Sequence, residues 1–319
     1  MKAILIGDNK DLLWRDVPDP ERKKGEIVVE IRAAGLNRAD LMQREGTYPP
    51  PPGWPEWMGL EAAGVVADAG VGSRWKIGDK VCALLGGGGY AERVAVPEGM
   101  VLPVPRGLSF VEAAAIPEVF ATAYLNLSVE GGMKSGDTVF IQAGASGLGT
   151  AAIQLAKLLG AKVVTTVGSA NKADFVRGLG ADVVINHNEE AVAAVLARHP
   201  ADVALDCVAG PDLGDCLQTM ARGGRWIVIA TLGGGPMSEL NMLDFFKRGV
   251  RLIGSTLRSR TGETKSRILG ELETHVWSHF STGAIQSVIH RALPIARAEE
   301  AHAILLNREN IGKVVLEIG

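Results

Sequence analysis

The middle of the chain alternates short apolar runs with stretches in which apolar residues recur every three or four positions. The apolar runs lie at 137–142, 161–167, 181–187, 201–208, 224–231 and 250–256, and helices are expected at 149–160, 172–180, 189–199, 212–221 and 243–249. Near-continuous apolar strands are expected where helices cover both faces of a sheet. The pattern therefore predicts a doubly wound parallel sheet of the dinucleotide-binding kind, from about residue 120 to 257.

The first 119 residues have a different pattern, in which Gly and Pro interrupt short strands, as is typical of an irregular β-barrel. Strands are expected at 1–14, 26–35, 62–70, 78–86 and 90–97, and the last segment adds a strand at 288–295, a helix at 298–307 and a strand at 312–319. We therefore expect an α/β protein with two domains. The substrate domain would be discontinuous (1–119 and 258–319), with the dinucleotide-binding domain (120–257) inserted between its two segments. The stretch YPPPPGWPEW favours an extended segment, either a plain surface loop or a lip over a pocket.

Composition narrows the possible partners. The chain has 319 residues, 47% of them hydrophobic, and a net charge of -3 with no long run of one sign, so we expect neither a nucleic-acid nor a membrane partner. No apolar run reaches bilayer length, and charges follow the first apolar run at once, so it resembles a strand more than a signal peptide. The three cysteines, Cys82, Cys207 and Cys216, lie far apart, which favours buried thiols and a cytoplasmic location.

The segment QAGASGLGT follows a predicted strand and opens a predicted helix. A pyrophosphate needs close approach by backbone N–H groups at the positive end of a helix, and Gly144, Gly147 and Gly149 leave room for it. Ser146 stands where the usual dinucleotide fingerprint has its middle glycine. A tight turn without a ligand is the alternative, but the surrounding alternation of strands and helices favours a nucleotide site.

The end of the second central strand indicates which cofactor is used. An NAD enzyme would place an acidic residue there for the ribose hydroxyl, whereas this chain has Gly168 and Ser169. Lys172 brings a cation within reach, so the segment predicts a preference for NADPH. His187, just past the third strand, is either a surface or capping residue or a further donor to the 2'-phosphate.

Motifs from one end of the chain to the other resemble a known superfamily. They are GLNRADLMQREGTYPPPPG, GLEAAGVV, WKIGDKVCALL, GGYAERVAVP, AAAIPEVFATAY and NIGKVVLEI. With the glycine-rich turn they are similar to the medium-chain dehydrogenases/reductases, and within these to the zinc-free quinone oxidoreductases. The resemblance implies a Rossmann cofactor domain and a GroES-like substrate domain.

Comparison with the zinc-dependent branch of the superfamily implies that no metal is used. Those enzymes have Cys where Asn37 stands, His where Leu60 stands, and a further Cys near Glu118. A catalytic zinc needs three protein ligands, which Glu61 and Glu118 alone do not provide. Because a quinone is conjugated and electron-poor, it accepts hydride from a nicotinamide without a Lewis acid.

The resemblance also implies four residues near the nicotinamide: Asn37, Asp40, Tyr48 and Ser146. Asn37 would bind the nicotinamide ribose or a substrate oxygen, and Tyr48 would donate a hydrogen bond or a proton to the reduced oxygen. The Ser146 hydroxyl would face the nicotinamide, and Asp40 would orient Asn37 or Arg44. Each has a structural alternative: Asn37 and Asp40 cap a short helix, Tyr48 packs on the prolines, and Ser146 satisfies its own turn.

Other positions would surround the cofactor by the same resemblance: Thr122, Leu148, Cys207, Val208, Leu232, Gly233, Leu257 and Arg258. The implied function is an NADPH-dependent quinone oxidoreductase acting on a small-molecule quinone. An enone, alkenal or enoyl-thioester reductase is the alternative enzyme, and a non-catalytic or crystallin-like NADPH-binding protein is the alternative of another class. We expect a homodimer or a dimer of dimers, with the apolar strand at 251–257 as the dimer edge.

Overall fold

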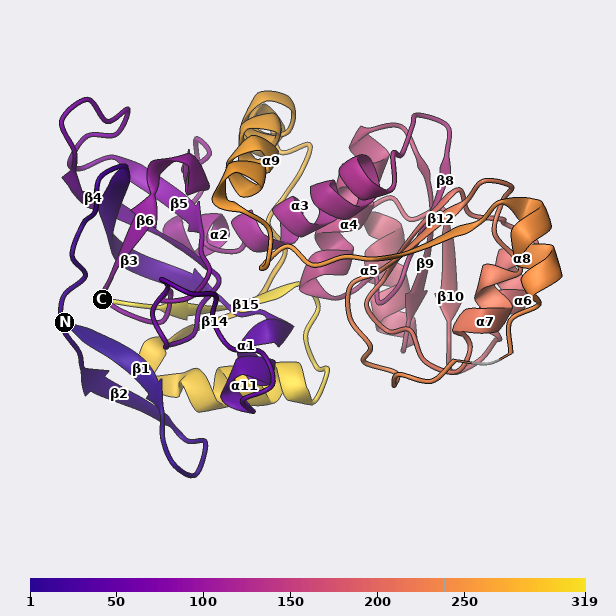
Figure 1. Cartoon of the computed structure of the whole chain (residues 1–319), viewed down its shortest axis with the longest axis horizontal. Coiled ribbons are helices and arrows are strands. Elements are labelled where there is room, and N and C mark those ends of the chain that lie inside the picture. Colours follow the sequence, from indigo (N-terminus) through magenta and orange to yellow (C-terminus); the bar gives the residue numbers. More distant parts are fainter. Residues whose placement is uncertain (238) are drawn as a thin grey trace. The chain divides into compact units, whose positions relative to one another are not determined.

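The computed structural model describes residues 1–237 and 239–319, and these divide into two compact units (Figure 1). The terminal unit comprises Met1–Ala121 and Arg258–Gly319, and the central unit comprises Thr122–Leu257. Among the described residues, no helix has the length and apolar character needed to cross a bilayer.

The central unit contains a six-stranded parallel sheet at the positions that the apolar runs predicted. Its strands are β8 (Thr138–Ile141), β9 (Lys162–Val167), β10 (Val183–Asn186), β11 (Val203–Asp206), β12 (Arg225–Val228) and β13 (Arg251–Gly254). They pair in the order β10-β9-β8-β11-β12-β13. This order confirms the doubly wound sheet, and its direction of winding reverses between β8 and β11, where such sheets bind their ligands beyond the carboxyl ends of the strands.

Helices cover both faces of this sheet (Figure 1). Those between the strands are α4 (Gly147–Leu158), α5 (Ala170–Gly178), α6 (Val192–Leu196), α7 (Leu213–Leu217) and α8 (Met242–Arg248). Under α6 and α7 the core is built around Phe140 and Trp226, both 0% exposed, whose ring centroids lie 5.4 Å apart. Large rings such as these bury much apolar surface and contribute strongly to a core.

Two helices are shorter than their sequence pattern predicts. The helix expected at 189–199 covers only Val192–Leu196, and the helix expected at 212–221 covers only Leu213–Leu217. Pro200 disfavours helical backbone at the residue before it, and Gly223 adopts a positive φ of 73° in the turn before β12. Beyond α7 the apolar pattern continues because Met220 in the following turn packs on the core, whereas Ala197 and Arg198 after α6 are exposed.

The terminal unit contains a seven-stranded sheet built around one long strand. Its strands are β3 (Glu26–Gly35), β4 (Glu61–Ala69), β5 (Lys80–Leu84), β6 (Arg93–Pro97), β7 (Val101–Pro103), β14 (Ile289–Pro294) and β15 (Lys313–Glu317). β3 pairs antiparallel with β4, with β6 near its beginning and with β15 near its end. The pairing of Val315 with Gly35 explains why the end of the chain belongs to the same unit as its beginning.

The prediction of a single strand at 1–14 is wrong, because this segment forms a hairpin of two strands. β1 (Lys2–Ile6) pairs antiparallel with β2 (Leu12–Asp16). The turn between them contains Asp8 and Asn9, residue types that favour turns, and Lys10 has a positive φ of 63°. The apolar residues on both sides of this polar turn read as one strand in the sequence.

Further helices come before and after the central sheet in the sequence. They are α1 (Arg38–Arg44), α2 (Phe110–Ala113), α3 (Pro117–Tyr124), α9 (Gly262–His275), α10 (Trp277–Ser281) and α11 (Ala298–Leu306). Short 3-10 turns occupy Glu98–Met100 and Ile295–Arg297, and a π-helical turn, Leu125–Glu130, follows α3 directly. In the terminal unit two residues, Leu36 and Asn37, separate β3 from α1, and the polar cluster of this unit described below lies at that connection.

Candidate functional site

The glycine-rich turn after β8 is packed so tightly that two of its glycines admit no side chain. A Cβ at Gly144 would lie 2.2 Å from Thr165 Oγ1, and a Cβ at Gly149 would lie 2.3 Å from the carbonyl oxygen of Ala143. α4 begins at Gly147, so its first N–H groups and the positive end of its dipole lie at this turn. The turn therefore has the two features that bind a pyrophosphate, small residues and a helix N-terminus.

Ser146 is the N-cap of α4. Its Oγ accepts a hydrogen bond of 3.0 Å from Gly149 N, so the hydroxyl does satisfy its own turn, as one of the two alternatives had it. A serine hydroxyl that accepts in this way still has one O–H to donate. Its expected position facing a nicotinamide stays a prediction.

Of the four residues singled out for the 2'-phosphate, three lie at the end of β9 and the start of α5, and His187 directly follows β10. A Cβ on Gly168 would lie 3.2 Å from Cε1 of His187, so the imidazole rests against this glycine. Ser169 is the N-cap of α5, and Lys172 lies in its first turn. Partial burial lowers the pKa of Lys172 from its usual value. The structure thus places His187 against Gly168, directly before the N-cap of α5, and Asn188 donates to the Gly168 carbonyl at 2.9 Å.

Two further pairs of expected cofactor positions meet beyond the ends of β11 and β12. Gly233 N donates to the Val208 carbonyl at 2.7 Å, and Leu232 N donates to the Cys207 carbonyl at 3.4 Å. Burial raises the pKa of the Cys207 thiol to about 12, so it is neutral at physiological pH and is not a nucleophile. Cys82 and Cys216 are buried free thiols whose pKa values burial also raises.

Asp206, which the sequence did not single out, shapes this turn. Its Oδ1 accepts from the backbone N–H groups of Val208 and Ala209 at 2.7 and 2.8 Å, and its Oδ2 accepts from Trp226 Nε1 at 2.9 Å. The side chain is 1% exposed, and burial raises its pKa. An acidic residue that ends a buried strand was the signal in the sequence.

The remaining expected cofactor positions are held by local packing. Leu148 is half-buried in the first turn of α4, Leu257 is 4% exposed, and the carbonyl oxygen of Thr122 accepts from Asn126 Nδ2 at 2.7 Å. The role of each toward a cofactor stays a prediction.

In the terminal unit, Asn37 and Asp40 lie at the start of α1. Asn37 is the N-cap, and Asp40 Oδ2 accepts from the Asn37 backbone N–H at 2.8 Å. Asp40 also accepts from Gly59 N and from the Tyr90 hydroxyl, both at 3.1 Å. The carboxyl is 1% exposed, and burial raises its pKa to about 6 against the opposing effect of these hydrogen bonds.

These contacts correct one of the roles considered for Asp40. It does not orient Arg44, which instead donates to the Lys10 carbonyl at 2.6 Å and pairs with Glu299 at 2.8 Å. Arg44 is in the last turn of α1, and its side chain extends toward the hairpin and α11. Asp40 therefore supports the backbone that presents Asn37.

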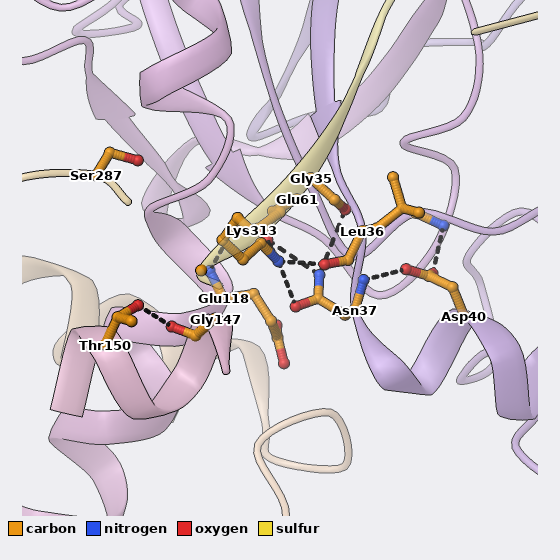
Figure 2. Close-up of polar contacts among 12 residues, drawn as sticks. Gly35, Leu36, Asn37, Asp40, Glu61, Glu118, Gly147, Thr150, Ser287 and Lys313 are labelled. Atoms are coloured by element: carbon orange, nitrogen blue, oxygen red, sulfur yellow. Dashed lines mark hydrogen bonds and ion pairs between the residues drawn. The ribbon is translucent and has the colours of Figure 1, made fainter. Parts of the chain in front are cut away.

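A buried ion pair, which the sequence analysis did not identify, holds the Asn37 side chain. Glu61 is 0% exposed and Lys313 is 4% exposed, and Lys313 Nζ lies 2.6 Å from Glu61 Oε1. Lys313 also donates to Asn37 Oδ1 at 2.7 Å and to the Leu36 carbonyl, and Asn37 Nδ2 donates to Glu61 Oε1 at 3.0 Å. Figure 2 shows Lys313 and Asp40 on opposite sides of Asn37. The sequence signal was a lysine that opens the final strand, directly before three apolar residues.

Arg258 makes a set of contacts that the sequence did not predict. Its guanidinium donates to carbonyls of its own unit, Gly86 at 2.9 and 3.1 Å and Tyr48 at 2.8 Å, and its expected place beside a cofactor stays a prediction. It also donates to Gln43 Oε1 at 2.6 Å and lies 4.8 Å from the centroid of the Tyr48 ring. Because the side chain is 6% exposed and its donors are used in this way, Arg258 fixes the half-buried Tyr48.

The proline-rich stretch packs on a run of four glycines rather than standing away from the surface. A Cβ on Gly86 would lie 2.6 Å from the Trp54 ring, and a Cβ on Gly87 would lie 2.9 Å from the Pro55 carbonyl oxygen. The stretch is therefore held against residues 86–89, next to the Tyr48 and Arg258 contacts. Whether it limits the width of a substrate pocket stays a prediction.

Comparison with known proteins identifies the family. The chain is 31% identical to the quinone oxidoreductase of Sus scrofa, over 99% of this chain and 97% of that protein. The chain belongs to the quinone oxidoreductase-like branch of the medium-chain dehydrogenase/reductase superfamily. Two family models agree with the two parts of the fold: the alcohol dehydrogenase GroES-like domain matches residues 23–106, and the zinc-binding dehydrogenase family matches residues 147–273.

Solved structures of this superfamily have the same fold along the whole chain. The quinone oxidoreductase of Thermus thermophilus, known also in complex with NADPH, is 34% identical, with full coverage of both chains and a TM-score of 0.84. An NAD-dependent alcohol dehydrogenase is 31% identical, again with full coverage of both chains, and has a TM-score of 0.87. The GroES-like domain and the Rossmann-like sheet expected from the sequence are thereby confirmed, and the protein is an oxidoreductase of this superfamily.

One matching family is described as zinc-binding, so the side chains that could bind a metal ion need to be identified. Across residues 1–237 and 239–319, no group of three or more His, Cys, Asp or Glu side chains lies close enough to hold a metal ion. Leu60 is an apolar side chain with 2% exposure, and burial followed by repulsion from Glu61 raises the pKa of Glu118. The Glu61 carboxylate is already bonded to the Lys313 ammonium.

Proposed function

We propose that this oxidoreductase transfers hydride from NADPH to a small-molecule quinone without a metal. The observation that carries the cofactor preference is the group at the end of β9, where Gly168, Ser169, Lys172 and His187 gather with no carboxylate among them. The quinone assignment draws its support from full-length similarity to quinone oxidoreductases.

The residues of the central unit fit a dinucleotide. The turn at 144–149 would receive the pyrophosphate on its backbone N–H groups, because Gly144 and Gly149 keep side chains away from it. The Lys172 ammonium, the Ser169 hydroxyl and His187 would bind the 2'-phosphate, for which charge-assisted hydrogen bonds are the strongest available contacts. When bound, NADPH would supply the hydride.

The terminal unit offers hydrogen-bond donors in place of a Lewis acid. The Tyr48 phenol is half-buried, and Arg258 fixes its position through the backbone carbonyl and the ring. A donor held in this way can supply a hydrogen bond or a proton to the oxygen of a quinone as it is reduced. Reduction without a metal is consistent with the apolar Leu60 and with a Glu61 carboxylate already paired with Lys313.

The first test is the Lys172→Glu variant. Steady-state rates with NADPH and with NADH would be measured against a panel of ortho- and para-quinones, with and without a chelator. We expect KM for NADPH to rise roughly thirtyfold, since reversing one charge beside a phosphate costs about 2 kcal/mol. KM for NADH should change little, because NADH has no 2'-phosphate.

Lys134→Glu is the matched control, since Lys134 is an exposed lysine of the same unit outside the nucleotide group. It should leave both KM values unchanged. Equal effects of Lys172→Glu on both nucleotides would contradict the phosphate site, and loss of activity with the chelator would contradict the metal-free mechanism. NADPH binding without turnover on any quinone would refute the substrate and direct the next assays to enones and enoyl thioesters.

A further inference from the structure

The orientation of the Asn37 carboxamide is determined by the groups on either side of it (Figure 2). Its oxygen faces Lys313 Nζ at 2.7 Å, and its nitrogen faces Glu61 Oε1 at 3.0 Å. An ammonium can only donate hydrogen bonds and a carboxylate can only accept them. A reversed amide would place two donors together and two acceptors together, so only one orientation is stable.

The ion pair of Lys313 and Glu61, which imposes this orientation, is buried. Lys313 opens β15, which pairs with β3, and Glu61 opens β4 on the other side of β3, so strand pairing brings both residues to Asn37 at the end of β3. A buried ion pair rarely stabilises a fold more than apolar residues of the same size would. Its direct contact with a half-buried amide at the candidate site points to a role in orienting that amide.

This orientation determines which kind of hydrogen bond Asn37 can offer. Both hydrogens of Nδ2 are directed inward, to Glu61 at 3.0 Å and to the Gly35 carbonyl at 3.4 Å. The oxygen receives one hydrogen bond from Lys313 and has a second lone pair. Asn37 can therefore accept from a hydroxyl group, but it has no hydrogen left for the carbonyl oxygen of a quinone.

We propose that Lys313 and Glu61 are positioning residues that hold the Asn37 oxygen ready to accept a hydrogen bond from a hydroxyl group. The hydroxyl belongs to the nicotinamide ribose or to the reduced quinone. The inference rests on the proposed function, because it assumes that a nicotinamide cofactor is bound and that a quinone is reduced. In this orientation the Asn37 oxygen can accept a hydrogen bond from a hydroxyl group, and donation from its nitrogen to the carbonyl oxygen of a quinone is excluded.

The test uses two variants of the full-length protein. Lys313→Met removes the donor that orients the amide but leaves the Glu61 carboxylate buried without its cation. Lys313→Met with Glu61→Gln removes both charges, so no unpaired charge remains to unfold the protein. Lys2→Met is the control, since Lys2 forms an exposed pair with Asp16 in the same unit. Circular dichroism and thermal melting establish that each variant is folded.

Dissociation constants for NADPH and for adenosine 2',5'-bisphosphate, which lacks the nicotinamide ribose, are measured without any quinone present. If the hydroxyl belongs to the ribose, the double variant binds NADPH about tenfold more weakly and the bisphosphate within twofold of the original protein, as expected for one lost hydrogen bond. If it belongs to the reduced quinone, NADPH binding is unchanged and kcat for quinone reduction falls about tenfold.

Two results would overturn the proposal. One is a folded double variant with unchanged NADPH binding and unchanged kcat, and the other is equal weakening of NADPH and the bisphosphate, which would indicate a purely structural pair. A different result would show that the proposed function itself is wrong. If the original protein binds NADPH but reduces no quinone, the quinone assignment fails, and the comparison of the two nucleotides still decides the ribose contact.

Discussion

Buried polar groups in the terminal unit differ in whether they have hydrogen-bond partners. Lys313 and Glu61 satisfy each other and the Asn37 amide, whereas His302, 1% exposed on α11, has no hydrogen-bond partner at either ring nitrogen among the described residues. Its ring contacts Tyr90 edge to face at a centroid distance of 6.0 Å. Burial, with a smaller effect from Arg44, lowers the pKa of His302 to about 3.

His302 should make the protein sensitive to acid. Its folded-state pKa lies below the unfolded value of about 6.5, so the stability it contributes is present above pH 6.5 and is lost as the pH falls toward 3. At pH 5 the loss should be about 2 kcal/mol. His302→Leu should remove this loss, measured as the difference in free energy of unfolding by urea between pH 7.5 and pH 5.

His275→Leu is the control for His302→Leu, because His275 is exposed on α9 and makes only a surface pair with Glu271. Its unfolding free energy should follow that of the original protein at both pH values. An acid sensitivity that persists undiminished in His302→Leu would show that His302 is not its source.

At the scale of elements, the connection from β8 to α4 combines tight packing with a ligand-binding geometry. The carbonyl oxygen of Ala143 and the Cα of Gly144 both lie within 2.6 Å of where a Cβ on Gly149 would be. These are backbone atoms, which cannot move aside as the end of a flexible side chain can. A glycine at position 149 is therefore required by the packing of the turn, and the proposed approach of a phosphate would require it as well.

Gly149→Ala should be destabilising and should also weaken nucleotide binding. We expect a loss of about 1–3 kcal/mol in the free energy of unfolding, as for other overpacked sites, together with a higher dissociation constant for NADPH. Gly270→Ala is the matched control, because Gly270 lies within α9, is exposed and has nothing within 4 Å of where a Cβ would be. It should stabilise the protein by about 0.5–1 kcal/mol. Urea unfolding and nucleotide titration would show whether the two substitutions differ in sign.

At the scale of the whole molecule, the central sheet ends in β13, whose outer edge is available for pairing. Leu252 on this strand is 42% exposed, and Phe246 on the preceding helix is 76% exposed. An exposed apolar strand at the edge of a sheet tends to pair with another chain. The homodimer expected from the sequence stays a prediction, as does the cytoplasmic location.

Leu252→Glu should weaken self-association if β13 is the dimer edge. A charge on this strand would have to be buried when two copies meet, so the mass measured by light scattering after gel filtration should shift toward that of a single chain. Leu306→Glu, at a leucine 61% exposed in the terminal unit, should leave the mass unchanged. A Leu252→Glu protein of unchanged dimeric mass would show that copies associate through another surface.

The sequence by itself determined the elements whose signals are local. Alternating apolar runs located all six strands of the central sheet, and the glycine pattern located the turn at 144–149, because strand burial and close backbone packing constrain the residues that form them. The same local signals failed at the hairpin of β1 and β2 and at the ends of α6 and α7. In those places the apolar pattern continues across a turn or beyond a helix end.

Only the tertiary structure decided how the polar groups are paired. Glu61 and Lys313 are 252 positions apart in the chain, and the antiparallel pairing of β3 with β4 and β15 brings both to Asn37. In the same way, Arg258 meets Tyr48 and Gly86 only once the chain has returned to the terminal unit. Hydrogen bonds and ion pairs depend on distances of about 3 Å between groups far apart in sequence, so their partners follow from the fold and not from local pattern.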